Sequence, residues 1–233
     1  MRPQNYVEMH ETFLSEELFF GLLGKILYKD PDQAWYKTLL DEDVFSEVPF
    51  GGNQPDTVKG LKKIQEWKEK NHGLTEKSFE ALTSDHLYLF IGVGKVLAPV
   101  WESVYFNPAR LIFQEETFKV RNWYGRYKLQ VKNKNKEPDD HIGLEFLFIA
   151  HLAKQGLEAL EKQEHTEAEA LFQAQKDFLS EHLLRWGTAW CDQVDKHAKT
   201  DFYRGISLIV RGSLAELSST YELNVPVKIA QWE

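Results

Sequence analysis

Cysteine is nearly absent from this 233-residue chain, which has one, Cys191. A single cysteine cannot form an intramolecular disulfide, and it excludes a zinc site built from several cysteines of the chain. Its neighbours Trp190 and Val194 are apolar. We therefore expect Cys191 to be a small buried residue rather than a catalytic nucleophile.

Long apolar runs are also missing. Lys95 and His151 interrupt the longest ones within about ten residues, which is too short to span a bilayer. Residues 1–11 contain no apolar core of the kind that secretory signals have, and they include Glu8 and Glu11. We therefore expect a cytoplasmic protein without stable membrane insertion.

Basic residues are fewer than acidic ones. Lysine and arginine total 28 against 36 aspartates and glutamates, which gives a net charge of −8. A global basic field that would attract nucleic acid or an anionic membrane is missing, so we expect no nucleic-acid partner. The acidic balance instead suits a positively charged peptide or protein.

Helical periodicity is abundant, and the chain is 42% hydrophobic, which is enough for a packed core. Asp30, Thr75 and Thr200 are placed to cap helices at their N-termini. The segment 92–108 is the least helical, and we expect an ordered loop there, with a short strand at 100–106 as the lesser alternative. The predicted helices lie around 14–27, 31–40, 58–70, 75–89, 120–127, 168–178, 186–190 and 202–221, with one more from about residue 139.

These segments predict an all-α fold of roughly ten helices in a single globular bundle. A polar run, Lys132 to Lys136, separates two helical halves. We expect a hinge at 131–137 between an N-terminal part, about 1–130, and a C-terminal part, 138–233.

Nucleotide and metal motifs are incomplete. Around Gly92-Val93-Gly94-Lys95 a P-loop would need glycine at 89 and a hydroxyl residue at 96, where Leu89 and Val96 stand. His141 and Glu145 share one helix face, but a metal site needs a third ligand. The sequence favours a helix-start histidine hydrogen-bonded to a carboxylate over a metal ligand.

The segment 137–146 is the most unusual in the chain. It packs three carboxylates and an imidazole at the start of a helix that follows the polar run. Carboxylates are favoured there because they accept from free backbone N–H groups and complement the helix dipole. Capping needs only one or two of them, so the surplus acids could receive a cationic ligand. Both interpretations stay open on these residues alone.

The same segment carries a resemblance. Its pattern is Glu137-Pro138-x-Asp140-His141-x-x-x-Glu145, and it is accompanied by Asp85-His86-Leu87-Tyr88-Leu89-Phe90-Ile91-Gly92, by Pro99-Val100-Trp101-Glu102-Ser103-Val104-Tyr105 and by Phe202-Tyr203-Arg204. In order and spacing these resemble the motifs of the TorD/DmsD family, the dedicated cytoplasmic chaperones of bacterial molybdoenzymes. The similarity extends from about Leu14 to Leu217. Phe146 and Gly92-Val93-Gly94 depart from the family pattern, which bears on the shape of the pocket.

The resemblance implies an all-α chaperone that is not an enzyme and has no cofactor of its own. Its partner would be the twin-arginine signal peptide of an apo-molybdoenzyme of the DMSO or TMAO reductase type, held until the molybdenum cofactor is inserted. Tat export or cofactor-insertion proteins are further implied partners. A monomer with some domain-swapped dimer, opening at 131–137, is also implied.

A receptor for an arginine pair and an apolar stretch needs carboxylates beside aromatic side chains. We expect Asp140 and His141 to tolerate joint replacement by alanine with most of the fold intact. The alternatives are a small metal- or nucleotide-dependent enzyme that uses Asp140, His141 and Glu145, and a helical regulatory scaffold. The predicted peptide-binding residues are Phe90, Trp101, Ser103, Tyr105, Trp123, Glu137, Pro138, Asp139, Asp140, His141 and Glu145.

Overall fold

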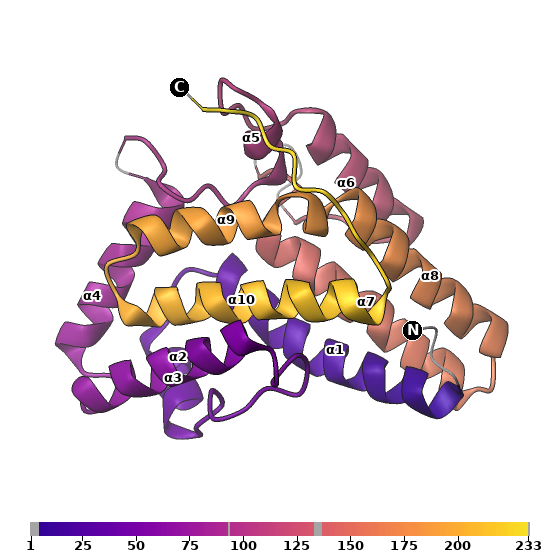
Figure 1. The fold of residues 1–233 in the computed structure, drawn as a ribbon, viewed down its shortest axis with the longest axis horizontal. Helices are drawn as coiled ribbons and strands as arrows, with labels where there is room; N and C mark the ends of the chain where they lie inside the picture. Colours follow the sequence, from indigo (N-terminus) through magenta and orange to yellow (C-terminus); the bar gives the residue numbers. More distant parts are fainter. Residues whose placement is uncertain (1–4, 93, 133–136, 233) are drawn as a thin grey trace. The chain divides into compact units, whose positions relative to one another are not determined.

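The computed structural model describes residues 5–92, 94–132 and 137–232. Within these ranges the chain forms ten α-helices, one π-helix and no strand, so the predicted all-α class is confirmed (Figure 1). The helices are α1 (Tyr6–Tyr28), α2 (Gln33–Asp41), α3 (Pro55–Lys70), α4 (Glu76–His86), the π-helix η1 (Leu87–Ile91), α5 (Glu102–Phe106), α6 (Glu115–Arg126), α7 (Ile142–Glu161), α8 (His165–Glu181), α9 (Leu183–His197) and α10 (Asp201–Thr220).

The chain divides into two compact units, each assembled from separate segments. Unit 1 contains Met1–Tyr28, Val100–Gly187 and Leu217–Glu233, and unit 2 contains Lys29–Pro99 and Thr188–Glu216. The described flanks of the predicted hinge, 131–132 and 137, both belong to unit 1. Residues 133–136 lie outside the described residues, as does Val93 of the glycine-containing loop, so the hinge stays a prediction.

Two of the predicted helix caps are confirmed. The Thr75 hydroxyl accepts from the Ser78 N–H, and the Ser78 hydroxyl accepts from the Thr75 N–H, which completes a capping box at α4. At α10 the Thr200 hydroxyl accepts from the Tyr203 N–H at 3.4 Å. Both caps depend on residues only three positions apart, and this is why sequence alone identifies them.

The cap predicted at Asp30 is wrong by two residues. Asp32 has extended backbone angles and its carboxylate accepts from the Trp35 N–H at 2.8 Å, so α2 begins at Gln33. Pro31 disfavours a helical conformation for the residue that precedes it, but it leaves Asp32 free to cap.

The segment predicted as a loop with a lesser chance of strand contains a short helix. Residues 102–106 form α5, and the extended structure is limited to one isolated bridge between Trp101 and His141. Strand propensity is decided by pairing and packing, which are tertiary properties. Here the N-terminus of α5 is capped by the side chain of Asp140, which is distant in the sequence.

The core of unit 1 is built on the close approach of α1 and α7. A Cβ atom added to Gly24 would lie 2.7 Å from the backbone oxygen of Gly143, and one added to Gly143 would lie 2.8 Å from the oxygen of Gly24. The two glycines therefore fix how these helices meet. The face of α1 that this packing buries includes Phe13 and Phe20, whereas Leu18, in the predicted apolar stripe, is 58% exposed.

Unit 2 has its own aromatic core. The Phe202 ring contacts the rings of Tyr36, Phe45 and Trp67, all with centroids within 6 Å. The Asp85 carboxylate accepts from the backbone N–H groups of residues 199 and 200 and from the Thr200 hydroxyl, which holds the start of α10.

A buried carboxyl network lies in unit 1. Glu16 is fully buried, and its carboxyl lies 2.8 Å from the Gln175 amide nitrogen and 2.9 Å from the Tyr221 hydroxyl. The same hydroxyl is 2.7 Å from the Gln175 side-chain oxygen. Burial raises the pKa of Glu16 to about 8, against a smaller opposing effect of the two hydrogen bonds. Around neutral pH the protonated carboxyl can therefore donate to Tyr221, which in turn donates to Gln175.

We predict that the two glycines of α1 respond oppositely to alanine. Gly24→Ala should destabilise the protein by about 1–3 kcal/mol, because the methyl group meets backbone that cannot move aside. Gly21→Ala is the matched control: nothing lies within 4 Å of its added Cβ, so better helix propensity should leave stability unchanged or raise it by up to about 1 kcal/mol. Urea unfolding measures both, and equal effects would contradict the close helix contact.

We also predict that Glu16 makes stability fall as pH rises. The pKa of Glu16 is higher in the folded chain than its ordinary 4.5, so the folded state binds the proton more tightly. This contribution is complete below pH 4.5 and is lost as pH rises toward 8, at about 1.4 kcal/mol for each unit of pKa difference. Glu16→Gln should therefore lose less stability than the wild type between pH 5 and 9, measured by thermal unfolding. Parallel pH profiles would refute the assignment, and exposed Glu11→Gln is the control.

Candidate functional site

Two segments far apart in the sequence lie side by side in unit 1. The Glu102 N–H donates to the Asp140 carbonyl at 2.9 Å, and the Ile142 N–H donates to the Val100 carbonyl at 2.8 Å. The segment that leads into α5 is therefore paired with the segment that leads into α7.

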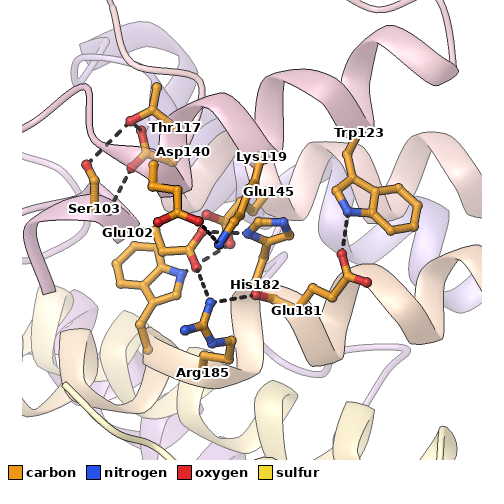
Figure 2. A network of polar contacts seen from close by, with 12 residues as sticks. Glu102, Ser103, Thr117, Lys119, Trp123, Asp140, Glu145, Glu181, His182 and Arg185 are labelled. Atoms are coloured by element: carbon orange, nitrogen blue, oxygen red, sulfur yellow. Dashed lines mark hydrogen bonds and ion pairs between the residues drawn. The ribbon is translucent and has the colours of Figure 1, made fainter. Parts of the chain in front are cut away.

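The Asp140 side chain makes the central contact between them. One carboxylate oxygen accepts from the Ser103 N–H at 2.7 Å and the other accepts from the Thr117 hydroxyl at 2.8 Å (Figure 2). Asp140 is fully buried, and burial raises its pKa while these hydrogen bonds act in the opposite direction. The carboxylate thus caps α5, a helix that lies earlier in the chain, rather than α7, which follows it.

The cap of α7 is an imidazole. His141 Nδ1 accepts from the Gly143 N–H at 3.0 Å, so this nitrogen carries no proton and the ring is held by its own helix. The ring also lies edge-on to Tyr28, with 5.2 Å between centroids. Of the two interpretations left open by the sequence, capping of this helix by a carboxylate does not apply to Asp140, because its carboxylate faces α5 and α6 instead.

The remaining acids of the segment differ in exposure. Asp139 is buried, and its carboxylate lies 2.7 Å from a guanidinium nitrogen of Arg121. Glu137 is half-buried and accepts from the Tyr28 hydroxyl at 2.8 Å. Burial, and to a smaller extent the hydrogen bond to Glu137, raises the pKa of Tyr28 to about 12. Pro138, between the two acids, is buried. Glu137 is thus the one carboxylate of 137–145 that keeps part of its surface in solvent.

Two further carboxylates lie in the interior behind this segment. Glu145 is fully buried, and one of its oxygens accepts from the Trp186 indole at 3.3 Å. Glu102 is also fully buried and lies 2.8 Å from His182 Nδ1 (Figure 2). Burial raises the pKa of both glutamates, and the Asp140 charge adds to the effect.

The basic groups near these glutamates differ in charge. Burial lowers the pKa of His182 to about 4, so the ring is uncharged at neutral pH. The Arg185 guanidinium forms an ion pair with Glu102 at 3.7 Å, and its charge lowers the pKa of Glu102 against the larger effect of burial. Protonated glutamates and a neutral imidazole are the forms that burial favours here. The interior of the site is therefore a buried polar framework whose side chains are not exposed to a ligand.

The predicted aromatic residues have different environments. Trp101 is half-buried, and its indole nitrogen has no hydrogen-bond partner among the described residues. Trp123 is buried and its indole donates to Glu181 at 2.9 Å, while Tyr105 is buried against Trp186. Phe90 belongs to unit 2, where its ring stacks on Trp190. All the predicted site residues except Phe90 thus belong to unit 1.

The sequence analysis missed Glu102, Thr117 and His182. Glu102 stood inside the Pro99–Tyr105 motif, between two predicted residues, and its apolar neighbours were the available sign of burial. Thr117 lies 23 positions from Asp140 and His182 lies 80 positions from Glu102. No local sequence pattern links residues at such separations, so neither contact could be predicted from the sequence.

Metal binding and membrane insertion find no support in the part of the chain that the structure describes. No three histidine, cysteine, aspartate or glutamate side chains are arranged there to hold an ion. His141 and Glu145 are directed to Gly143 and Trp186 instead. None of the described helices combines the length and the apolar character that crossing a membrane requires.

Comparison with known proteins gives consistent matches. The family model described as nitrate reductase delta subunit matches residues 55–192. The Tat proofreading chaperone DmsD of Salmonella paratyphi A is 30% identical over 224 residues, which cover 93% of this chain and 97% of the relative. The probable Tat proofreading chaperone DmsD of Haemophilus influenzae is 29% identical over 94% of this chain and 97% of its own length. The chaperone protein TorD of Vibrio cholerae is 31% identical over 49% of this chain and 51% of its own length.

We predict that Asp140 is a stability residue. Asp140→Ala leaves a buried N–H and a buried hydroxyl without acceptors and should cost about 3 kcal/mol, in contrast to the tolerance expected from the sequence. Asp41→Ala removes an exposed carboxylate paired with Lys37 and should cost under about 1 kcal/mol. Urea unfolding compares the two, and equal losses would show that the Asp140 contacts are not stabilising.

Proposed function

The chain belongs to the TorD/DmsD family of molybdoenzyme-specific chaperones, and we propose that it binds the twin-arginine signal peptide of its client. The client is an apo-molybdoenzyme of the DMSO or TMAO reductase type, held in the cytoplasm until its cofactor is inserted. Tat export or cofactor-insertion proteins are further proposed partners. The family is one of chaperones rather than enzymes.

One observation carries this proposal: relatives named Tat proofreading chaperones align with more than nine-tenths of the chain. The geometry supports it, because Asp140 joins two of the four sequence segments that carry the resemblance. A metal- or nucleotide-dependent enzyme is not favoured, since the matching proteins are chaperones.

We propose that the residues of the predicted site have two different roles. Asp139, Asp140 and His141 are buried and bonded to other parts of unit 1, so we propose that they position the site without contacting the peptide. Trp101 and Glu137 are half-buried and can offer an aromatic face and a carboxylate to a ligand. A guanidinium suits both, because it pairs with carboxylates and stacks on indole rings.

We predict two components of binding with different salt dependence. Glu137→Gln should weaken binding of a synthetic DMSO-reductase-type leader peptide most at about 0.1 M salt and less at about 1 M, because the Debye length falls from about 10 Å to about 3 Å. Trp101→Ala should weaken binding at both salt concentrations, by about 2 kcal/mol if the indole is an anchor. Titration calorimetry measures these affinities.

The control is Glu161→Gln, which removes an exposed carboxylate at the end of α7 and should leave affinity unchanged. Identical salt profiles for the Trp101 and Glu137 variants would contradict the two-component site. Unchanged affinity in both variants would place the peptide elsewhere on the protein.

A further inference from the structure

The C-terminal segment of unit 1 is bound to the protein as an extended peptide. After α10 the chain has no regular secondary structure from residue 223 to 232, and it runs from the end of that helix to α5 (Figure 1). Val227 and Ile229 are 43% and 39% exposed, so the middle of this tail buries little apolar surface. Its attachment depends on its last residues.

Two hydrogen bonds fasten the end of the tail to α5. The Ala230 N–H donates to the Tyr105 carbonyl at 2.8 Å, and the Trp232 indole donates to the Val104 carbonyl at 3.1 Å. The last carbonyl groups of any α-helix lack partners within the helix, and α5 has only five residues. The tail therefore supplies donors that this short helix cannot supply itself.

The Trp232 ring completes the attachment. It contacts the Tyr105 ring with 4.9 Å between centroids, and the Arg110 guanidinium lies 4.2 Å from the centroid of the same indole. Ala230 and Trp232 are half-buried while Gln231 between them is exposed, which is the alternation of an extended strand. The surface thus holds an extended segment through one main-chain N–H group and one large apolar side chain two residues further on.

We propose that this surface, formed by the Val104 and Tyr105 carbonyls, the Tyr105 ring and Arg110, is a docking site for an extended peptide with a large apolar side chain. Its occupant is the apolar stretch of the client's signal peptide, and the chain's own tail holds the site in the free protein. This inference rests on the proposed function.

Three features favour that occupant. An apolar stretch offers unpaired main-chain N–H groups together with large side chains, as the tail does at its last residues. The site lies on α5, directly after Trp101, and Asp140 fixes α5 against the segment that contains Glu137. Tyr105, which the sequence predicts as a groove residue, is 0% exposed with the tail in place, and departure of Trp232 would uncover its ring.

The test uses the intact chain and three variants. One variant lacks residues 227–233, one carries Trp232→Ala, and the control carries Gln231→Ala, which changes an exposed side chain in the same segment. Calorimetry with the synthetic leader peptide should show affinity at least threefold higher for the truncated chain and for Trp232→Ala, and unchanged for the control. Hydrogen exchange in the intact chain should show faster exchange of the Ala230 amide when the leader peptide is bound.

The outcomes separate this inference from the proposed function. Equal affinity in all four proteins, with the Ala230 amide still protected at saturation, would overturn the docking site and leave signal-peptide binding standing. Failure of all four to bind the leader peptide would overturn both. If the truncated chain does not fold, Trp232→Ala and the exchange of the Ala230 amide decide the question.

Discussion

The Asp140 carboxylate is the interaction on which the site depends. A buried charge is expensive unless it is fully hydrogen-bonded, and Asp140 meets this requirement with the Ser103 N–H and the Thr117 hydroxyl. These partners belong to α5 and α6, so satisfying one carboxylate fixes two helices against the start of α7. The short helix α5 keeps its position because of this contact, and the half-buried Trp101 immediately before it is placed by the same contact.

The burial of the other carboxylates limits which of them could contact a cationic peptide. Glu102 and Glu145 lie in the interior, where burial raises their pKa, and Asp139 is paired with Arg121. Much of the acidity of this region is therefore buried or paired with arginine instead of facing solvent. In the proposed function, arginine is recognised by partly exposed groups such as Glu137, where a charge costs less to keep and is more strongly screened by salt.

A short helix also explains why the C-terminal tail lies where it does. Five residues cannot satisfy their own terminal carbonyl groups, and the tail provides a main-chain donor and an indole donor. In the proposed docking site, two hydrogen bonds and one ring hold the tail, so that exchange for another peptide has a modest cost. This property suits a chaperone, which must hold a peptide and later release it.

The all-α class, most of the helices and the caps at Thr75 and Thr200 can be predicted from the amino-acid sequence, because these depend on apolar periodicity and on contacts three residues apart. The sequence also located the segments around Trp101 and Asp140 through their resemblance to a known family. Their contacts and burial, in contrast, depend on how distant segments pack together. The contact of Asp140 with Ser103 crosses 37 positions and that of Glu102 with His182 crosses 80, and no local pattern encodes such pairs. Burial likewise depends on packing between helices, so the sequence could not distinguish the carboxylates that hold the fold from the one that faces solvent.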